Sequence, residues 1–159
     1  MIKPTQITNQ LFYGADAVCT HGLDSSFAVI HACKTCHSRR LRYTGSLPSS
    51  HPNYLAWSGD HHLYLNLIDP PKPLFMPGSF VQFFQFADAE IRDRPLLIHC
   101  NQGESRAPSL ALLYMAKRLN LLPDDSYHSA KVEFEKHYSY HPGLGIQMFL
   151  ERNWEALGK

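Results

Sequence analysis

The feature that most constrains the fold is the stretch from Pro95 to Leu119, in which a polar loop joins two apolar runs. The run at 96–98 has the composition of a buried strand. The run at 110–119 has that of a buried helix, and Pro108 suits the first turn of this helix. The sequence therefore predicts a strand, a tight loop and a helix in direct succession.

The loop of this stretch is suited to bind a phosphate group. A loop of this kind aims backbone N–H groups and the positive end of a helix dipole at one point, which favours a dianion. Cys100 is its first residue and Arg106 its last. A helix N-terminus and a guanidinium facing the thiol would be expected to favour its thiolate form, so Cys100 is a candidate nucleophile toward phosphorus. Arg106 offers a planar fork of donors that matches two phosphate oxygens, and Gly103 permits the tight turn.

The motif His99-Cys100-x-x-Gly103-x-x-Arg106 resembles the signature loop of the cysteine-dependent protein tyrosine phosphatases. The short chain is most similar to their compact dual-specificity branch. This resemblance implies that Cys100 forms a phosphocysteine intermediate, that Arg106 holds the phosphoryl group, and that His99 sits behind the thiolate. The alternative is a buried cysteine and a surface arginine that share this spacing by chance. The phosphate-binding loop implied by the resemblance consists of Asn101, Gln102, Gly103, Glu104, Ser105 and Arg106.

One residue departs from the pattern of this family. Ala107 stands directly after the arginine, where the family usually has Ser or Thr. That hydroxyl is thought to help the thiolate leave when the intermediate is hydrolysed, and Ser109 would point elsewhere on a helix. We therefore expect slow turnover with accumulation of phosphoenzyme. The alternative is a phosphate-binding module with slow or no turnover.

Asp69 is the candidate general acid. The alternating run at 62–68 predicts a strand, and Pro70 holds Asp69 out of the helical region. Asp69 therefore follows the carboxyl end of a strand, where α/β sheets place their ligand sites. The family that the chain resembles has its general acid on a loop at this point, where a carboxylic acid protonates the leaving group and later activates water. An ordinary turn aspartate is the alternative, and Asp60 and Glu104 are the other candidate acids.

The segment between residues 26 and 60 is harder to interpret. A β-rich run at 26–30 predicts a buried strand that leads into a surface loop, with Cys33 partly buried. We expect an irregular insertion at about 37–60, which either folds over a site or carries short helical turns such as 52–57. Its basic cluster is either a solvated face or lines the approach to the phosphate pocket. This cluster consists of Arg39, Arg40 and Arg42.

The motif Cys33-x-x-Cys36-His37 leaves two further interpretations open. It has the spelling of a covalent haem attachment site, although haem of that kind normally accompanies export and the chain has no apparent signal sequence. It could also bind zinc, with His31 or with a second set of ligands. An ordinary surface loop is the favoured interpretation. The histidines that could complete a zinc site are His51, His61 and His62.

The remaining segments predict an opening strand or hairpin at 7–14, a helix within 15–23 and a frame of amphipathic helices. Pro77-Gly78 is expected to precede one helix as its breaker, and Asp124 and Asp125 to open another. The apolar stripes that we expect to face the core are Phe80, Phe83, Phe84, Ala87 and Ile91; Tyr127, Ala130, Phe134 and Tyr138; and Ile146, Phe149, Leu150, Trp154 and Leu157.

These patterns favour an α/β fold with a short, mostly parallel central sheet flanked by helices, in a single phosphatase-like domain over residues 1–159. A net charge of +1 gives no basic excess for binding nucleic acid. No apolar run approaches the roughly 18 residues of a membrane helix, so no membrane partner is expected. The chain has four cysteines and is long enough not to need disulfide bonds. A thiolate nucleophile must stay reduced, so we expect the protein to be cytoplasmic.

The function that we expect is hydrolysis of a phosphate monoester in a phosphorylated protein or peptide, by two in-line displacements at phosphorus. No metal or other cofactor is expected, because the loop supplies the positive charge. A substrate such as an RNA 5′-phosphate or another non-protein phosphate is an alternative. A sulfur-transfer enzyme is a third alternative, because the active-site loop of rhodanese-type enzymes also starts with a cysteine at the end of a strand. Asp69 and the spacing from Cys100 to Arg106 argue against this alternative. The sequence does not predict the oligomeric state.

Overall fold

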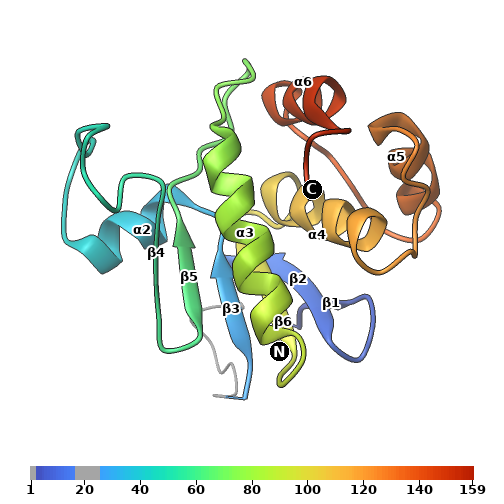
Figure 1. Cartoon of the computed structure of the whole chain (residues 1–159), viewed down its shortest axis with the longest axis horizontal. Helices are drawn as coiled ribbons and strands as arrows, with labels where there is room; N and C mark the ends of the chain where they lie inside the picture. Colours follow the sequence, from blue (N-terminus) through green and yellow to red (C-terminus); the bar gives the residue numbers. More distant parts are fainter. Residues whose placement is uncertain (1–2, 17–25) are drawn as a thin grey trace.

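The computed structural model describes residues 3–16 and 26–159 (Figure 1). Within these residues, six strands form one mixed sheet with the order β1-β2-β6-β3-β5-β4. The four central strands are parallel and both edge strands are antiparallel to their neighbours, which confirms the predicted sheet. The strands are β1 (Thr5–Gln6), β2 (Leu11–Ala15), β3 (Ala28–His31), β4 (Ala56–Gly59), β5 (His62–Leu65) and β6 (Leu96–Cys100).

The predicted succession of strand, loop and helix is β6, the loop after it and α4. The opening hairpin is also present, although its first strand, β1, starts before residue 7. The helix expected within 15–23 falls mainly on residues outside the described part of the chain. The described helices are α2 (Lys34–Leu41), α3 (Pro77–Glu90), α4 (Arg106–Lys117), α5 (Tyr127–Glu135) and α6 (Leu144–Asn153).

One face of the sheet packs on the large hydrophobic core. Successive side chains of a strand point to opposite faces, and Ile30 and Ile98, which are paired between β3 and β6, both point to this face. In Figure 1, α3 crosses in front of the strands, with α4 beside it. The predicted stripes of α3, α5 and α6 supply much of this core: Phe80, Phe83, Phe84, Ala87, Tyr127, Ala130, Phe134, Ile146, Phe149, Leu150, Trp154 and Leu157.

The opposite face of the sheet carries a smaller apolar cluster and a group of histidines. Val29 and Leu97 form the cluster with two partly buried phenylalanines. His31 and His99 follow two residues later in β3 and β6, so they point to the same face as the cluster. Helix α2 covers them, and its Cys36 lies 3.9 Å from the His99 ring. The helices therefore lie on both faces, as predicted.

The prediction of a surface loop after β3 was wrong. Cys33 is fully buried and is the N-terminal capping residue of α2, which continues to Leu41. The expected insertion at 37–60 therefore begins inside a helix and contains strand β4, and only residues 42–55 and Asp60 lack both kinds of element. Arg42 ends α2 in the left-handed conformation. The apolar pattern of α2 is weak because it covers polar imidazoles, and this explains why the sequence did not reveal it.

Two predicted helix starts also need correction. Pro77 is the first residue of α3 and not a breaker before it, which suits a residue without a backbone N–H. Helix α5 begins at Tyr127 and not at the two aspartates, because the Ser126 side chain accepts a hydrogen bond from the Ser129 N–H at 3.0 Å.

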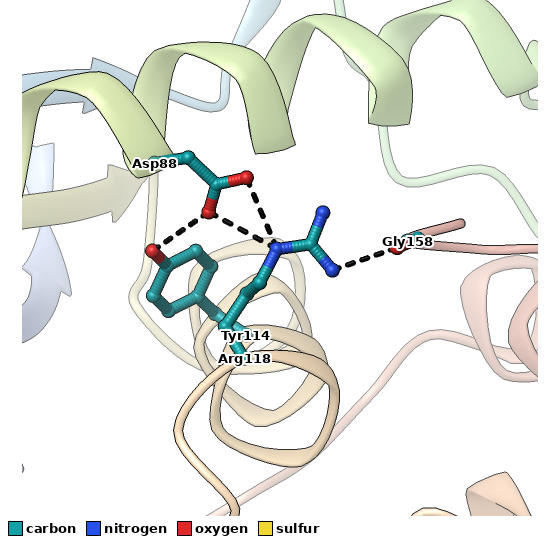
Figure 2. A network of polar contacts seen from close by, with 4 residues as sticks. All are labelled: Asp88, Tyr114, Arg118 and Gly158. Carbon is teal, nitrogen blue, oxygen red and sulfur yellow. Dashed lines mark hydrogen bonds and ion pairs between the residues drawn. The ribbon is translucent and has the colours of Figure 1, made fainter.

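A polar network joins α3, α4 and the C-terminal segment (Figure 2). The Asp88 carboxylate of α3 accepts hydrogen bonds from the Tyr114 hydroxyl at 2.9 Å and from Arg118 Nε at 3.0 Å. Arg118 Nη1 also donates to the Gly158 carbonyl at 2.7 Å. This network fixes the α4 helix, whose first turn carries Arg106, against the rest of the core.

No helix in the described residues combines the length and the apolar character that crossing a membrane requires.

Candidate active site

Cys100 ends β6 and is 2% exposed. The backbone N–H groups of Gly103 and Ala107 each donate to its Sγ atom at 3.3 Å. Both donors belong to the loop and to the first turn of α4, so the positive end of the helix dipole also faces the sulfur. The sulfur therefore lies in a ring of backbone donors at the start of a helix, an arrangement that also suits the oxygens of an anion.

The loop turns tightly around this sulfur because of Gly103. Its φ of 72° lies in the left-handed region, which a residue with a side chain rarely adopts. A Cβ atom at this position would lie 2.9 Å from the backbone of Gly14 and from that of Ala15, at the end of β2. Glycine therefore supplies both the conformation and the close approach of the loop to the sheet.

Arg106 is held in place by two acceptors from different parts of the chain. Its Nη1 donates to the Leu67 carbonyl and its Nη2 to Asn101 Oδ1, both at 2.8 Å. Its Nε is buried and has no hydrogen-bond partner among the described residues. Two hydrogen bonds therefore fix the guanidinium group, and its Nε–H remains available to donate to a ligand. Asn101 is fixed in turn, because its Nδ2 donates to Thr35 Oγ1 at 3.0 Å and to Asp16 Oδ2 at 3.3 Å.

A cavity of about 340 Å³ opens above the cysteine. A neighbouring cavity of about 380 Å³ shares Asp69, Asn101 and Arg106 with it and extends to Lys34 and Thr35 of α2. The start of α2 therefore borders the same open region as the loop. The residues that line the first cavity are Asp69, Cys100, Asn101, Gln102, Glu104, Ser105, Arg106 and His141.

Asp69 is exposed and lies where the parallel strand β5 leads toward the loop. It packs against the backbone of Gly143, where a Cβ atom would overlap the Asp69 carboxylate. A Cβ atom at Gly145 would likewise overlap the carbonyls of Pro70 and Lys72. The segment that carries Asp69 therefore rests on the start of α6. Asp60 lies in the turn between β4 and β5, at the opposite end of β5, so the geometry does not support it as an acid.

The segment before α6 closes the loop from the other side. The Ser105 Oγ accepts a hydrogen bond from the Gly143 N–H at 2.8 Å, and the Glu104 carbonyl accepts one from the His141 N–H at 2.9 Å. Sequence reasoning missed His141, Gly143 and the Leu67 carbonyl as parts of the site. Nothing in the local sequence marks them, because each reaches the loop through packing of distant segments.

Ala107 and Ser109 are the two residues considered above for a hydroxyl group near the Cys100 sulfur. Ala107 is fully buried, and its contact with Cys100 Sγ is made by its backbone N–H. Ser109 points away and its hydroxyl lies 2.6 Å from the Tyr140 hydroxyl. Neither residue therefore places a hydroxyl group on the Cys100 sulfur.

His99 lies behind the cysteine, on the face of the sheet that α2 covers. Its Nε2 is 2.7 Å from His31 Nδ1. Burial lowers the pKa of His99 below its ordinary value, so the ring is neutral at pH 7. The basic cluster lies on this side too, because Arg39, Arg40 and Arg42 line a separate cavity with His31 and Cys36. These arginines line neither of the two cavities beside Cys100 and Arg106.

No protein-family model matches the sequence, and no curated protein matches it. Solved structures share its fold. The PTP-2 phosphatase of Cydia pomonella is 19% identical with a TM-score of 0.62, and the match covers 96% of this chain and 91% of that chain. Human DUSP28 is 14% identical with a TM-score of 0.59, and 98% of both chains is covered.

A third structure with this fold is the human tyrosine phosphatase-like serine/threonine/tyrosine-interacting protein. It is 18% identical with a TM-score of 0.60, and the match covers 95% of this chain and 94% of that chain. These structures confirm the expected fold, which is that of the compact dual-specificity phosphatases, over nearly the whole length of the chain.

Proposed function

We propose that this chain, which has the fold of the dual-specificity phosphatases, hydrolyses phosphate monoesters of proteins or peptides through a phosphocysteine intermediate. The observation that carries this proposal is the convergence on one cavity of a sulfur that accepts two backbone N–H bonds and a guanidinium fixed opposite it. A sulfur in such a nest is activated as a nucleophile, and the same donors suit the oxygens of a phosphoryl group.

In the first step the Cys100 thiolate attacks phosphorus, and the bond between phosphorus and the ester oxygen breaks. The loop N–H groups and Arg106 bind the three equatorial oxygens as their charge is redistributed. The buried Arg106 Nε, which has no partner in the described part of the chain, supplies one of these donors. Asp69 gives its proton to the departing alkoxide or phenoxide, so the alcohol leaves as a neutral molecule.

In the second step water attacks the phosphocysteine. Asp69, now a carboxylate, takes a proton from this water, and the bond between phosphorus and sulfur breaks. Inorganic phosphate leaves and the Cys100 thiolate is restored. The position of Asp69 in the wall of the cavity suits both roles, because the leaving group and the attacking water occupy the same side of phosphorus.

The substrates that fit best are phosphotyrosine and phosphoserine or phosphothreonine in exposed protein segments. The neighbouring cavities give an open surface around Asp69, and the solved structures with this fold include proteins described as phosphatases. A reduced Cys100 is essential to the proposed chemistry, so we place the enzyme in the cytoplasm.

Hydrolysis of p-nitrophenyl phosphate tests the proposal. We expect activity that vanadate inhibits and that Cys100→Ser abolishes. Asp69→Asn is expected to lower kcat about tenfold or more for alkyl phosphates and much less for aryl phosphates, which have better leaving groups. Asp60→Asn is the matched control, because Asp60 lies at the far end of β5. Equal losses on both substrate types would contradict the role of Asp69.

A phosphate-binding module with slow turnover is the second candidate. It is favoured by the absence of a hydroxyl group on Ala107, which contacts the sulfur through its backbone alone. In that case purified protein would bind phosphate and vanadate at Cys100 but would release p-nitrophenol only once per chain.

A further inference from the structure

Three side chains that commonly bind metals converge between the histidine-bearing face of the sheet and α2. His31 Nδ1, Cys36 Sγ and His99 Nε2 lie within 4.8 Å of one another. All three residues are buried, with exposed fractions of 3%, 6% and 0%. We propose that these side chains form a binding site for one Zn²⁺ ion. The proposal does not depend on the proposed phosphatase activity.

The spacing of these atoms is close to that of a tetrahedral zinc site. Zn–N bonds of about 2.0 Å and a Zn–S bond of about 2.3 Å place neighbouring ligand atoms about 3.3–3.5 Å apart. His99 Nε2 lies 2.7 Å from His31 Nδ1 and 3.9 Å from Cys36 Sγ. These two distances differ from the ideal values by about half an ångström, and the ligand atoms of His31 and Cys36 lie within 4.8 Å of each other. Side-chain rotations that move the ligand atoms by up to about 1 Å would therefore bring all three to coordination distances.

The fold holds these ligands on rigid elements. His31 and His99 are partners in the register of the parallel strands β3 and β6, and both point to the face that α2 covers. Cys36 belongs to the first turn of α2, which begins three residues after the end of β3. The short connection leaves α2 little freedom to move away from the two rings. Sites on strands and helices keep their geometry better than sites on loops.

A second layer of contacts orients His31. Its Nε2 lies 2.9 Å from His62 Nδ1, and its ring stacks on Tyr64 with centroids 4.1 Å apart. Histidine ligands of metals usually donate their other ring N–H to a hydrogen-bond acceptor, which fixes the tautomer; His62 Nδ1 is the acceptor here. With the proton of His31 on Nε2 and shared with His62, Nδ1 presents its lone pair toward Cys36 and His99.

The site is accessible from outside. A cavity of about 280 Å³ is lined by His31 and Cys36 together with Arg39, Arg40, Arg42 and Tyr64. It gives the ion a route of access and leaves room for a water molecule or a small anion as fourth ligand. The guanidinium groups favour a negatively charged fourth ligand. In the bound state, the charge of this ligand and that of the zinc-bound Cys36 sulfur offset the repulsion between the arginines and the ion.

Binding changes the protonation of the ligands in a defined way. The Cys36 thiol loses its proton to solvent as the Zn–S bond forms. The proton shared between His31 Nδ1 and His99 Nε2 is displaced, and the neutral His99 ring carries it on Nδ1 instead. One proton is therefore released for each zinc ion bound, and no oxidation or reduction occurs.

This ligand set differs from the one that the Cys33-x-x-Cys36-His37 spacing indicated. Both ring nitrogens of His37 make hydrogen bonds to other groups: Nδ1 lies 2.7 Å from the Tyr43 hydroxyl and Nε2 lies 2.9 Å from the Asn53 carbonyl. His61 pairs with Glu90 at 3.0 Å. The fold therefore combines one member of the motif with histidines from two strands.

The test uses the full chain with Cys100→Ser, because a reactive thiolate at Cys100 could itself bind metal. After treatment with a chelator, the protein is dialysed against Zn²⁺ or Co²⁺ and the bound metal is measured. We expect one ion per chain, a rise in Tm, and a thiolate-to-cobalt charge-transfer band in the near ultraviolet. Adding Cys36→Ser should abolish this band and weaken zinc binding at least tenfold.

Two matched controls accompany this variant. Cys33→Ser changes the neighbouring buried thiol, which makes a hydrogen bond with Cys36 but is not one of the three converging ligand groups, and it should keep the cobalt band. His61→Ala removes a histidine that pairs with Glu90, and it should also leave binding unchanged. No bound metal in the Cys100→Ser protein, or loss of the band in Cys33→Ser, would overturn the proposal.

X-ray absorption of the zinc-loaded Cys100→Ser protein gives a test that does not require the Cys36→Ser protein to fold. We expect a first coordination sphere with one sulfur atom and two imidazole nitrogens. A sphere with two sulfur atoms, or with none, would show that the ligand set is wrong.

Discussion

The backbone of Gly143 lies directly against the carboxylate of Asp69, so that a Cβ atom at position 143 would overlap Asp69 Oδ1. The two residues are far apart in the sequence, and they meet because Gly143 and Gly145 pack on the segment at 69–72 that follows β5. The same glycine donates its N–H to Ser105 in the loop. One residue thus connects the candidate acid with the loop between β6 and α4.

Gly143→Ala should therefore displace Asp69. We expect kcat for alkyl phosphates to fall about tenfold, because general acid catalysis contributes roughly 10²- to 10⁴-fold and would be lost in part. Steady-state kinetics on alkyl and aryl phosphates measure this effect. In an Asp69→Asn background, Gly143→Ala should cause little further loss, since both changes act on the same step. Additive losses would show that the glycine acts elsewhere.

Asn101 fixes the position of Arg106. We expect Asn101→Ala to weaken binding of vanadate and phosphate about tenfold or more, because a hydrogen bond to a charged group contributes about 1.5–3 kcal/mol. Thr35→Val is the matched comparison, because Thr35 contacts only the far side of the Asn101 amide, and its effect should be smaller. Titration with vanadate at constant substrate measures both affinities. An unchanged affinity in Asn101→Ala would mean that the Leu67 carbonyl suffices to hold the guanidinium.

Ala107→Ser should speed the second step of the reaction. A hydroxyl group at this position would lie near the Cys100 sulfur and could stabilise the thiolate as it leaves. In rapid-mixing experiments we expect the unmodified chain to show a burst of p-nitrophenol followed by slow turnover. The variant should lose the burst and turn over faster. If the unmodified chain shows no burst, the second step does not limit its rate.

The buried tyrosine pair at α5 predicts loss of stability at high pH. The Tyr127 and Tyr140 hydroxyls lie 2.9 Å apart. Burial raises the pKa of Tyr140 from 10.0 to about 12 and also raises the pKa of Tyr127. Above pH 10.0 the unfolded chain releases these protons while the folded chain keeps them. The stabilisation from each group is therefore complete below the unfolded pKa and is lost as the pH rises toward the folded one.

Urea unfolding at a series of alkaline pH values tests this expectation. The free energy of unfolding should fall by about 1.4 kcal/mol per pH unit for each of the two groups. Tyr127→Phe should reduce this slope by the contribution of one tyrosine. Tyr64→Phe removes a hydroxyl group outside the pair and serves as the control. A slope that is the same in Tyr127→Phe would contradict the assignment.

The sequence alone determined the features that depend on neighbouring residues. The succession of β6, the loop and α4 follows from residues close together in the chain, so the apolar pattern and the spacing from Cys100 to Arg106 were sufficient to predict it. The core stripe of α3 was predicted for the same reason, since residues three and four apart on a helix lie on one face. The predicted strand over 62–68 was too long, because β5 ends at Leu65 and Asp69 lies in the irregular segment that follows it.

Only the tertiary structure decided which distant groups meet. The Leu67 carbonyl reaches Arg106, and Gly143 reaches Asp69, because the order of the strands and the packing of α6 bring these segments together. His31 and His99 become neighbours only because β3 pairs with β6 in that register. Helix α2 then places Cys36 over both rings, although its polar sequence predicted a loop. Local patterns decide conformation, but contacts between distant segments depend on how whole elements pack, which no single stretch of sequence specifies.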